Sequence, residues 1–279
     1  MKTSRRGLFR LGVAAASAGI FAGRTKVAHA KKRALKLGVA SDSLRNIPRP
    51  GAIEMVRALG TPYVNIKSFH LPYETSKAER ERARAQFEKS GLRIVGGGVI
   101  PIKDDTDDAV EFFFEYAKQC GMPLMAIAPT AQVMPRVEKF VKRYGIAVAI
   151  HNHGPEDQHF PAPSDGLEVI KGMDPRVGLC VDVGHTARTG VDVVEAVREA
   201  GGRILDMHMK DLRDFTDHRS QCAIGEGKMP VADIFRELIG MGYAGHVNLE
   251  YEIEPDNPLP GMKQSFAYMR GVLDGLAGS

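Results

Sequence analysis

Short apolar runs alternate with longer stretches of helical period along nearly the whole chain, and this alternation constrains the fold more than any other feature of the sequence. Each run reads as a buried strand, and the segment that follows it is long enough for a helix. The predicted strands cover residues 35–41, 63–69, 92–99, 124–129, 146–152, 177–183, 204–210 and 246–252. Eight strands separated by helical segments indicate a parallel sheet.

The clearest helical segments are residues 76–91 and 107–121, the second of which begins with acidic residues and ends at a glycine. Further helices are expected near residues 191–201, 230–241 and 262–276. Eight βα units in a chain of this length predict a single α/β domain that closes into a (β/α)8 TIM barrel. A doubly wound open sheet is the alternative, but no Gly-x-Gly-x-x-Gly motif opens the first unit.

The first thirty residues have the pattern of an export signal. The pair Arg5 and Arg6 is followed by a short apolar stretch and by Ala-His-Ala at residues 28–30, which fits a small-x-small cleavage site. We therefore predict a twin-arginine signal peptide over residues 1–30, a barrel domain over residues 31–279, and the twin-arginine (Tat) export machinery as a partner. This signal predicts a periplasmic or otherwise exported protein, and no later segment is apolar enough for a stable membrane anchor.

The positive charge of the chain comes from that same segment. Residues 1–30 contain six of the 38 basic residues and no acidic residue, so 32 basic and 34 acidic residues remain. The isoelectric point near 8.9 is therefore no indication of nucleic-acid binding. Three widely spaced cysteines, Cys120, Cys180 and Cys222, predict neither a disulfide framework nor a Cys-x-x-Cys zinc site.

Polar residues that can bind metals or substrates collect where the predicted strands end, which is the end of a TIM barrel that carries the active site. These residues are Lys67 and His70 after the second strand, His151 and His153 after the fifth, Asp182 and His185 after the sixth, His208 and Lys210 after the seventh, and Glu250 and Glu252 after the eighth. One such His is more often a hydrogen-bonded structural residue, and one such Asp is often a helix cap. Four consecutive strands with these residues favour a shared site over coincidence.

Two imidazoles and two carboxylates, one from each of these four strands, can bind a divalent ion and leave positions open for a substrate. We predict that the ligands are His151, Asp182, His208 and Glu250. His153 lies on the same strand face as His151 and is the alternative ligand. The mixed nitrogen and oxygen donors suit one ion of Mn, Zn or Co better than Mg or Ca.

These residues also form motifs that resemble a known family. Asp-Val-Gly-His-Thr at 182–186, His-Met-Lys-Asp at 208–211, Gly-Glu-Gly-Lys at 225–228 and Leu-Glu-Tyr-Glu at 249–252 are similar to motifs of the xylose isomerase-like barrel superfamily of sugar isomerases and epimerases. The resemblance covers the whole predicted barrel domain and implies one metal ion bound through Asp182, His208 and Glu250. The chain departs from the family at residues 151–153, where the usual Glu-Asn-His is His-Asn-His and His151 replaces a glutamate.

The resemblance implies a metal-dependent sugar isomerase or epimerase that removes a proton next to the carbonyl group of a small carbohydrate substrate. Glu250 is the expected proton carrier. A metal-bound imidazole at position 151 has no free lone pair to accept a proton, so either His185 or His153 supplies the second acid/base or the reaction needs only one base. The residues expected to bind the substrate are Lys67, His70, His153, Lys210 and Glu226.

Two other functions remain open. A lyase acting on 3-keto-glycosides could use the same metal site, and it needs only one base to begin, so the missing glutamate affects it less. A non-catalytic sugar-binding barrel is the second alternative.

Two further activities are disfavoured. The superfamily includes three-zinc apurinic endonucleases, but this chain lacks the additional His after the third strand and the Asp-x-His before the last strand that those enzymes need. The loop at residues 224–230 could bind a phosphate group. Export favours an unphosphorylated sugar instead, with Glu226 free to bind its hydroxyl groups.

Overall fold

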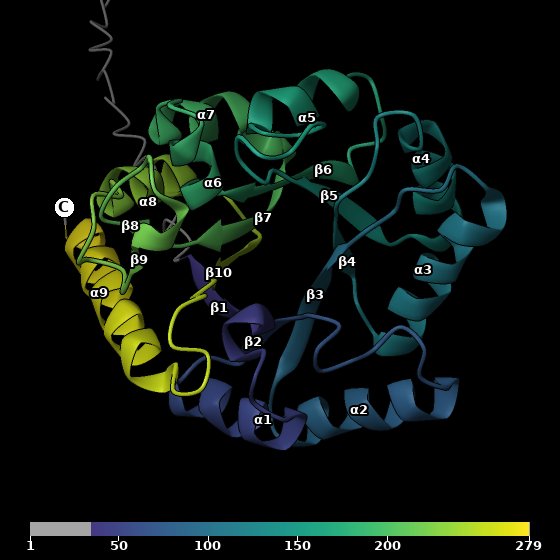
Figure 1. The fold of residues 1–279 in the computed structure, drawn as a ribbon, viewed down its shortest axis with the longest axis horizontal. Coiled ribbons are helices and arrows are strands. Elements are labelled where there is room, and N and C mark those ends of the chain that lie inside the picture. Colours follow the sequence, from purple (N-terminus) through teal and green to yellow (C-terminus); the bar gives the residue numbers. More distant parts are fainter. Residues whose placement is uncertain (1–34, 279) are drawn as a thin grey trace, which may run out of the picture. The chain divides into compact units, whose positions relative to one another are not determined.

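The computed structural model describes residues 35–278, and within them eight parallel strands close into a barrel (Figure 1). Around the barrel the strands follow the order β1, β10, β7, β6, β5, β4, β3 and β2. Their bounds are β1 (Lys36–Ala40), β2 (Tyr63–Ile66), β3 (Arg93–Ile100), β4 (Leu124–Ile127), β5 (Ala147–His151), β6 (Val177–Asp182), β7 (Ile204–Met209) and β10 (His246–Leu249). All eight predicted strands are present, and the predicted (β/α)8 barrel is confirmed.

Helices surround the barrel, as Figure 1 shows. They are α1 (Arg49–Ala58), α2 (Lys77–Lys89), α3 (Asp107–Cys120), α4 (Met134–Tyr144), α5 (Pro163–Val169), α6 (Val183–Arg188), α7 (Val193–Ala200), α8 (Val231–Gly240) and α9 (Leu259–Ala277). The starts of α2 and α3 follow the sequence, since the side chains of Ser76 and Thr106 each accept a hydrogen bond from a first-turn N–H. The prediction missed α1, α4, α5 and α6. The first three have a proline in the first turn, where a missing N–H costs little.

The inner face of the barrel is apolar below the strand ends and polar at the strand ends. Leu124, Ala126, Ala149 and Cys180 form a small apolar cluster that is separate from the large core. Because side chains two residues apart share a strand face, Ala149 lies below His151 and Cys180 lies below Asp182. Small side chains therefore fill the interior directly beneath the polar strand ends.

The predicted signal peptide and its cleavage site lie outside the described residues, so export stays a prediction. Within residues 35–278, none of the helices combines the length and the apolar character that crossing a membrane requires.

Candidate metal centre

Four side chains predicted as metal ligands come together at the ends of four neighbouring strands. His151, Asp182, His208 and Glu250 each offer one ligand atom, and these atoms all lie within 4.8 Å of one another. His208 Nδ1 lies 2.9 Å from His151 Nε2 and 3.1 Å from Glu250 Oε2. Asp182 Oδ2 lies 3.6 Å from His151 Nε2. The strand-end residues therefore form one buried cluster.

Asp182 has two roles, one for each carboxylate oxygen. Its Oδ1 accepts a hydrogen bond of 2.8 Å from the backbone N–H of His185 and so caps α6. This leaves Oδ2 directed toward the imidazole of His151. The Asp-x-x-His spacing thus serves the helix cap and the cluster at once.

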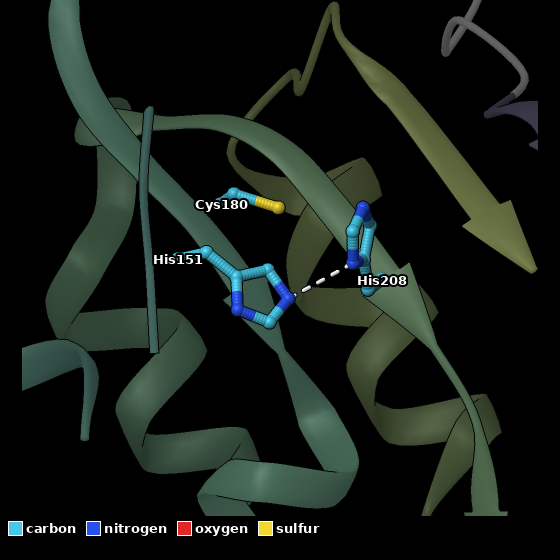
Figure 2. A group of neighbouring side chains, drawn as sticks. All are labelled: His151, Cys180 and His208. Atoms are coloured by element: carbon cyan, nitrogen blue, oxygen red, sulfur yellow. Dashed lines mark hydrogen bonds between the residues drawn. The ribbon is translucent and has the colours of Figure 1, made fainter. Parts of the chain in front are cut away.

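The His-Asn-His sequence at the end of β5 is explained by its middle residue. Asn152 Oδ1 accepts a hydrogen bond from the backbone N–H of Asp182, and its amide group donates to Thr186 Oγ1, which fixes β5 against β6. His151 therefore points into the cluster, where its ring faces His208 (Figure 2). Burial lowers the pKa of His151 well below its usual range, so the imidazole is neutral, as a metal ligand must be. His153 is only partly buried, and its ring lies 4.4 Å from that of His151.

The cluster has the donors and the spacing that a divalent ion requires. Two ligand atoms about 2.1 Å from one ion and at a right angle to each other lie about 3.0 Å apart. The distance between His151 Nε2 and His208 Nδ1 is 2.9 Å. All four side chains are buried. Two imidazoles and two carboxylates with ligand atoms this close together form the donor set of a divalent-ion site, so the residues fit a resident metal ion.

Two buried lysines balance the carboxylates. Lys210 Nζ lies 3.0 Å from both Asp182 Oδ2 and Glu250 Oε2, and Lys67 Nζ lies 2.9 Å from Glu250 Oε1. Burial opposes ionisation of both acids, but Lys210 lowers the pKa of Asp182, and His208 together with the lysines holds the pKa of Glu250 well below its usual range. Both carboxylates are therefore charged at neutral pH and can act as ligands.

A cavity of about 200 Å³ reaches the cluster. Lys67, His153 and His185, three of the predicted substrate and catalytic residues, line it beside His151 and Glu250. Phe69 also lines the cavity and is 54% exposed, so it presents an apolar surface on which a sugar ring can stack.

A wider polar hollow adjoins the cavity at His153. His153 lies between the cavity and a hollow of about 510 Å³ that is also lined by Lys103, Gln158 and His159. A ligand longer than one sugar ring can therefore continue past His153.

Asp42 is a cavity residue that the sequence analysis missed. It lies in the short 3-10 helix Ser41–Leu44, two residues after the end of β1. Burial and the nearby charge of Glu250 raise the pKa of Asp42 to about 6. Its carboxyl group can therefore gain or lose a proton near neutral pH. Its position just after a strand is the same signal that identified the other site residues.

Three residues predicted to bind the substrate do not line the cavity. His70 is buried, and its ring nitrogens contact Ser41 Oγ and the backbone carbonyl oxygens of Leu44 and Ile47. Lys210 directs its ammonium group toward Asp182, Glu250 and Glu252. Glu226 is exposed and forms an ion pair with Arg213. A substrate role for these three residues stays a prediction.

The loop at residues 224–230 is not built to bind phosphate. It follows the small hairpin of β8 (Asp211–Leu212) and β9 (Gln221–Cys222). The carboxylate of Asp211 accepts hydrogen bonds from the backbone N–H groups of Gly225, Gly227 and Met229. Because these N–H groups are already bonded, they cannot cradle a phosphate.

His70→Ala is expected to destabilise the fold and to leave metal binding intact. The substitution removes the donor to the partly buried carbonyl oxygen of Ile47 and one of the two donors to that of Leu44, which should lower the unfolding free energy by about 1–3 kcal/mol. Denaturant unfolding and metal content, measured on the same preparation, check both statements. Glu226→Gln, at an exposed position, is the control and should change neither. Loss of metal at unchanged stability would contradict the structural role of His70.

Comparison with known proteins gives a family match over most of the chain. A model of the family described as xylose isomerase-like TIM barrel matches residues 53–272. The inosose dehydratase of Mesomycoplasma hyopneumoniae (strain 7448) is 29% identical over 163 residues, which cover 51% of this chain and 53% of that protein. The rhizopine catabolism protein MocC of Rhizobium meliloti is 28% identical over 132 residues, which cover 42% of this chain and 40% of that protein. The chain thus spans about half the length of the curated relatives it matches.

Solved structures share the fold. An IOLI protein with a bound zinc atom superposes with a TM-score of 0.71 at 16% identity, covering 86% of this chain and 99% of that one. The 3-keto-D-glucoside 4-epimerase YcjR from E. coli superposes with a TM-score of 0.70 at 14% identity, covering 85% of this chain and 99% of that one. At these identities the likeness shows a common fold.

Proposed function

Because the chain belongs to the xylose isomerase-like TIM barrel family, we propose that it is a metal-dependent enzyme that isomerises or epimerises a carbohydrate by removing a proton next to a carbonyl group. The observation that carries this proposal is the buried cluster of His151, Asp182, His208 and Glu250 at the end of the cavity. The zinc atom of the IOLI structure and the sugar chemistry of the epimerase YcjR support it.

A divalent ion held by the four ligands would polarise the substrate carbonyl and stabilise the negative charge that develops when the neighbouring C–H loses its proton. Lys67 lines the cavity beside this position, and its ammonium group can donate a hydrogen bond to a substrate oxygen. Phe69 and His153 border the space that the rest of the sugar would occupy.

We assign proton transfer to Asp42 and His185. The low pKa of Glu250 suits a ligand but makes it a weak base, although the sequence analysis gave it both roles. The pKa of Asp42 near 6 lets its carboxyl group exchange protons close to neutral pH. Partial burial lowers the pKa of His185, so its imidazole is neutral and can accept a proton. Asp42 follows β1 and His185 follows β6, and β10 and β7 separate these strands, so the two groups can approach a bound sugar from different sides.

A lyase acting on 3-keto-glycosides is the second candidate. Elimination begins with the same proton removal but then expels a group from the next carbon, and a single base is enough to start it. The hollow beyond His153 favours it, because a glycoside carries a second group that needs space. The curated relative named inosose dehydratase is also named for an elimination.

The proposal predicts about one transition-metal ion per chain, with Mn, Zn or Co preferred by the two nitrogen and two oxygen donors. Metal analysis after loading and gel filtration tests the stoichiometry. Free sugars and 3-keto-glycosides incubated with the loaded protein in D2O should exchange one carbon-bound proton, seen by NMR. An epimer or isomer supports the first candidate, and a released group supports the lyase. Binding of sugar without exchange would indicate a non-catalytic barrel.

The place of action is a separate proposal. Arg5, Arg6 and the Ala-His-Ala sequence at 28–30 support export of the protein by the twin-arginine route, with its carbohydrate substrate outside the inner membrane. Secretion of the full chain, compared with an Arg5→Lys/Arg6→Lys double variant, tests this independently of activity.

A further inference from the structure

The thiol of Cys180 lies beneath the two imidazoles of the metal centre. Cys180 is fully buried on β6 and pairs in register with His151 on β5. One ligand atom each from His151, Cys180 and His208 lie within 4.8 Å of one another. Figure 2 shows the thiol directed from its strand toward the two rings. The same two imidazoles therefore lie within reach of the two carboxylates and of a sulfur.

A second observation concerns the free nitrogens of these rings. His151 Nδ1 and His208 Nε2 are buried, and among the described residues neither has a hydrogen-bond partner. Buried polar atoms of this kind are normally satisfied by a partner, a water or an ion. A neutral imidazole has one N–H and one lone pair, so each ring can carry its proton on this outer nitrogen and direct the lone pair of His151 Nε2 or His208 Nδ1 toward an ion.

We propose that His151, Cys180 and His208 form a second, deeper metal position that takes thiophilic ions such as Cd²⁺, Hg²⁺ or Cu⁺. Soft thiolate donors select these ions, whereas carboxylates favour harder ones. Because both positions use the same two imidazoles, an ion at the sulfur side excludes the ion at Asp182 and Glu250. Soft metals would then displace the functional ion from this centre.

The sulfur donor makes the deep position selective for soft ions. A cysteine binds a metal ion as its thiolate. Binding breaks the S–H bond, releases one proton to solvent and forms one metal–sulfur bond, with no change of oxidation state. A hard ion gains too little from sulfur to drive this release and stays with the carboxylates.

The test uses the full chain, loaded with Cd²⁺ under reducing conditions. We expect an ultraviolet thiolate-to-cadmium absorption band that saturates at one ion per chain, together with release of a proton. In Cys180→Ala the band should disappear and Cd²⁺ affinity should fall at least about tenfold, since loss of even an indirect metal contact costs about that much. Cys222→Ala, another buried cysteine, is the matched control and should keep the band. Mn²⁺ affinity should change less in Cys180→Ala than Cd²⁺ affinity does.

Exclusion is tested by competition. Cd²⁺ titrated into the Mn²⁺-loaded protein should release Mn²⁺, as seen by electron paramagnetic resonance, in step with the thiolate band. In Cys180→Ala the same release should need at least about ten times more Cd²⁺ and give no band. The ¹¹³Cd resonance of the wild type alone distinguishes a ligand set with sulfur from one with only nitrogen and oxygen, so the test does not depend on the folding of a variant. A wild-type resonance without sulfur character, or a band that persists in Cys180→Ala, would overturn the proposal. Neither result depends on the carbohydrate activity.

Discussion

Asp182→Asn is expected to lower the affinity for the functional divalent ion by more than about 100-fold, because loss of an indirect contact alone costs about 10–100-fold. The substitution removes the charged Oδ2 that faces His151. Asparagine keeps a side-chain oxygen that can accept the bond from the N–H of His185, so the cap of α6 survives. The loss should therefore appear in metal content and calorimetric titration but not in the far-ultraviolet circular dichroism.

Asp192→Asn is the matched control for this experiment. Asp192 caps α7 through the backbone N–H groups of Val194 and Glu195, which is the same structural role at an exposed position. This variant should bind metal as the wild type does. If both variants keep their metal, Asp182 is only a helix cap, and the proposed centre loses one of its four ligands.

The barrel and the location of the site could be predicted because both depend on chain topology. Parallel strands of a barrel all end on the same side, so polar residues at the ends of β5, β6, β7 and β10 had to gather there. No side-chain detail is needed for this step. Alternation along β5 likewise puts His151 and His153 on one face.

Side-chain direction could not be predicted, since it depends on contacts between distant segments. His70 follows a strand as the ligands do, but its imidazole forms hydrogen bonds with backbone carbonyl oxygens of the segment after β1. Lys210 turns toward the carboxylates because burial makes an unpaired ammonium costly. The loop at 224–230 resembles a phosphate loop in sequence, but its N–H groups bind Asp211, which lies more than ten residues earlier.

The second large effect is expected at position 151. His151→Ala should weaken binding of the divalent ion by about 100-fold or more, as expected for a lost ligand. His151→Glu should bind the ion at least as tightly as the wild type, because a carboxylate adds negative charge beside Asp182 and Glu250. His153→Ala should retain its metal, since His153 is not among the four clustered ligands. Loss of metal in His153→Ala but not in His151→Ala would reverse the assignment.

The turnover of His151→Glu should fall, although its metal affinity does not. Lys67 and Lys210 offset Asp182 and Glu250, and Lys210 also pairs with Glu252. A dication with two neutral imidazoles therefore leaves the centre with a net charge of about +1, and a glutamate at 151 reduces it to about 0. A less positive centre stabilises the negative charge of the transition state less well, so turnover should fall at least about tenfold even though the metal is bound. Metal content measured beside the rate of deuterium exchange from D2O separates the two effects. Equal or faster exchange by the metal-loaded His151→Glu variant would show that histidine at position 151 gives no catalytic advantage over glutamate.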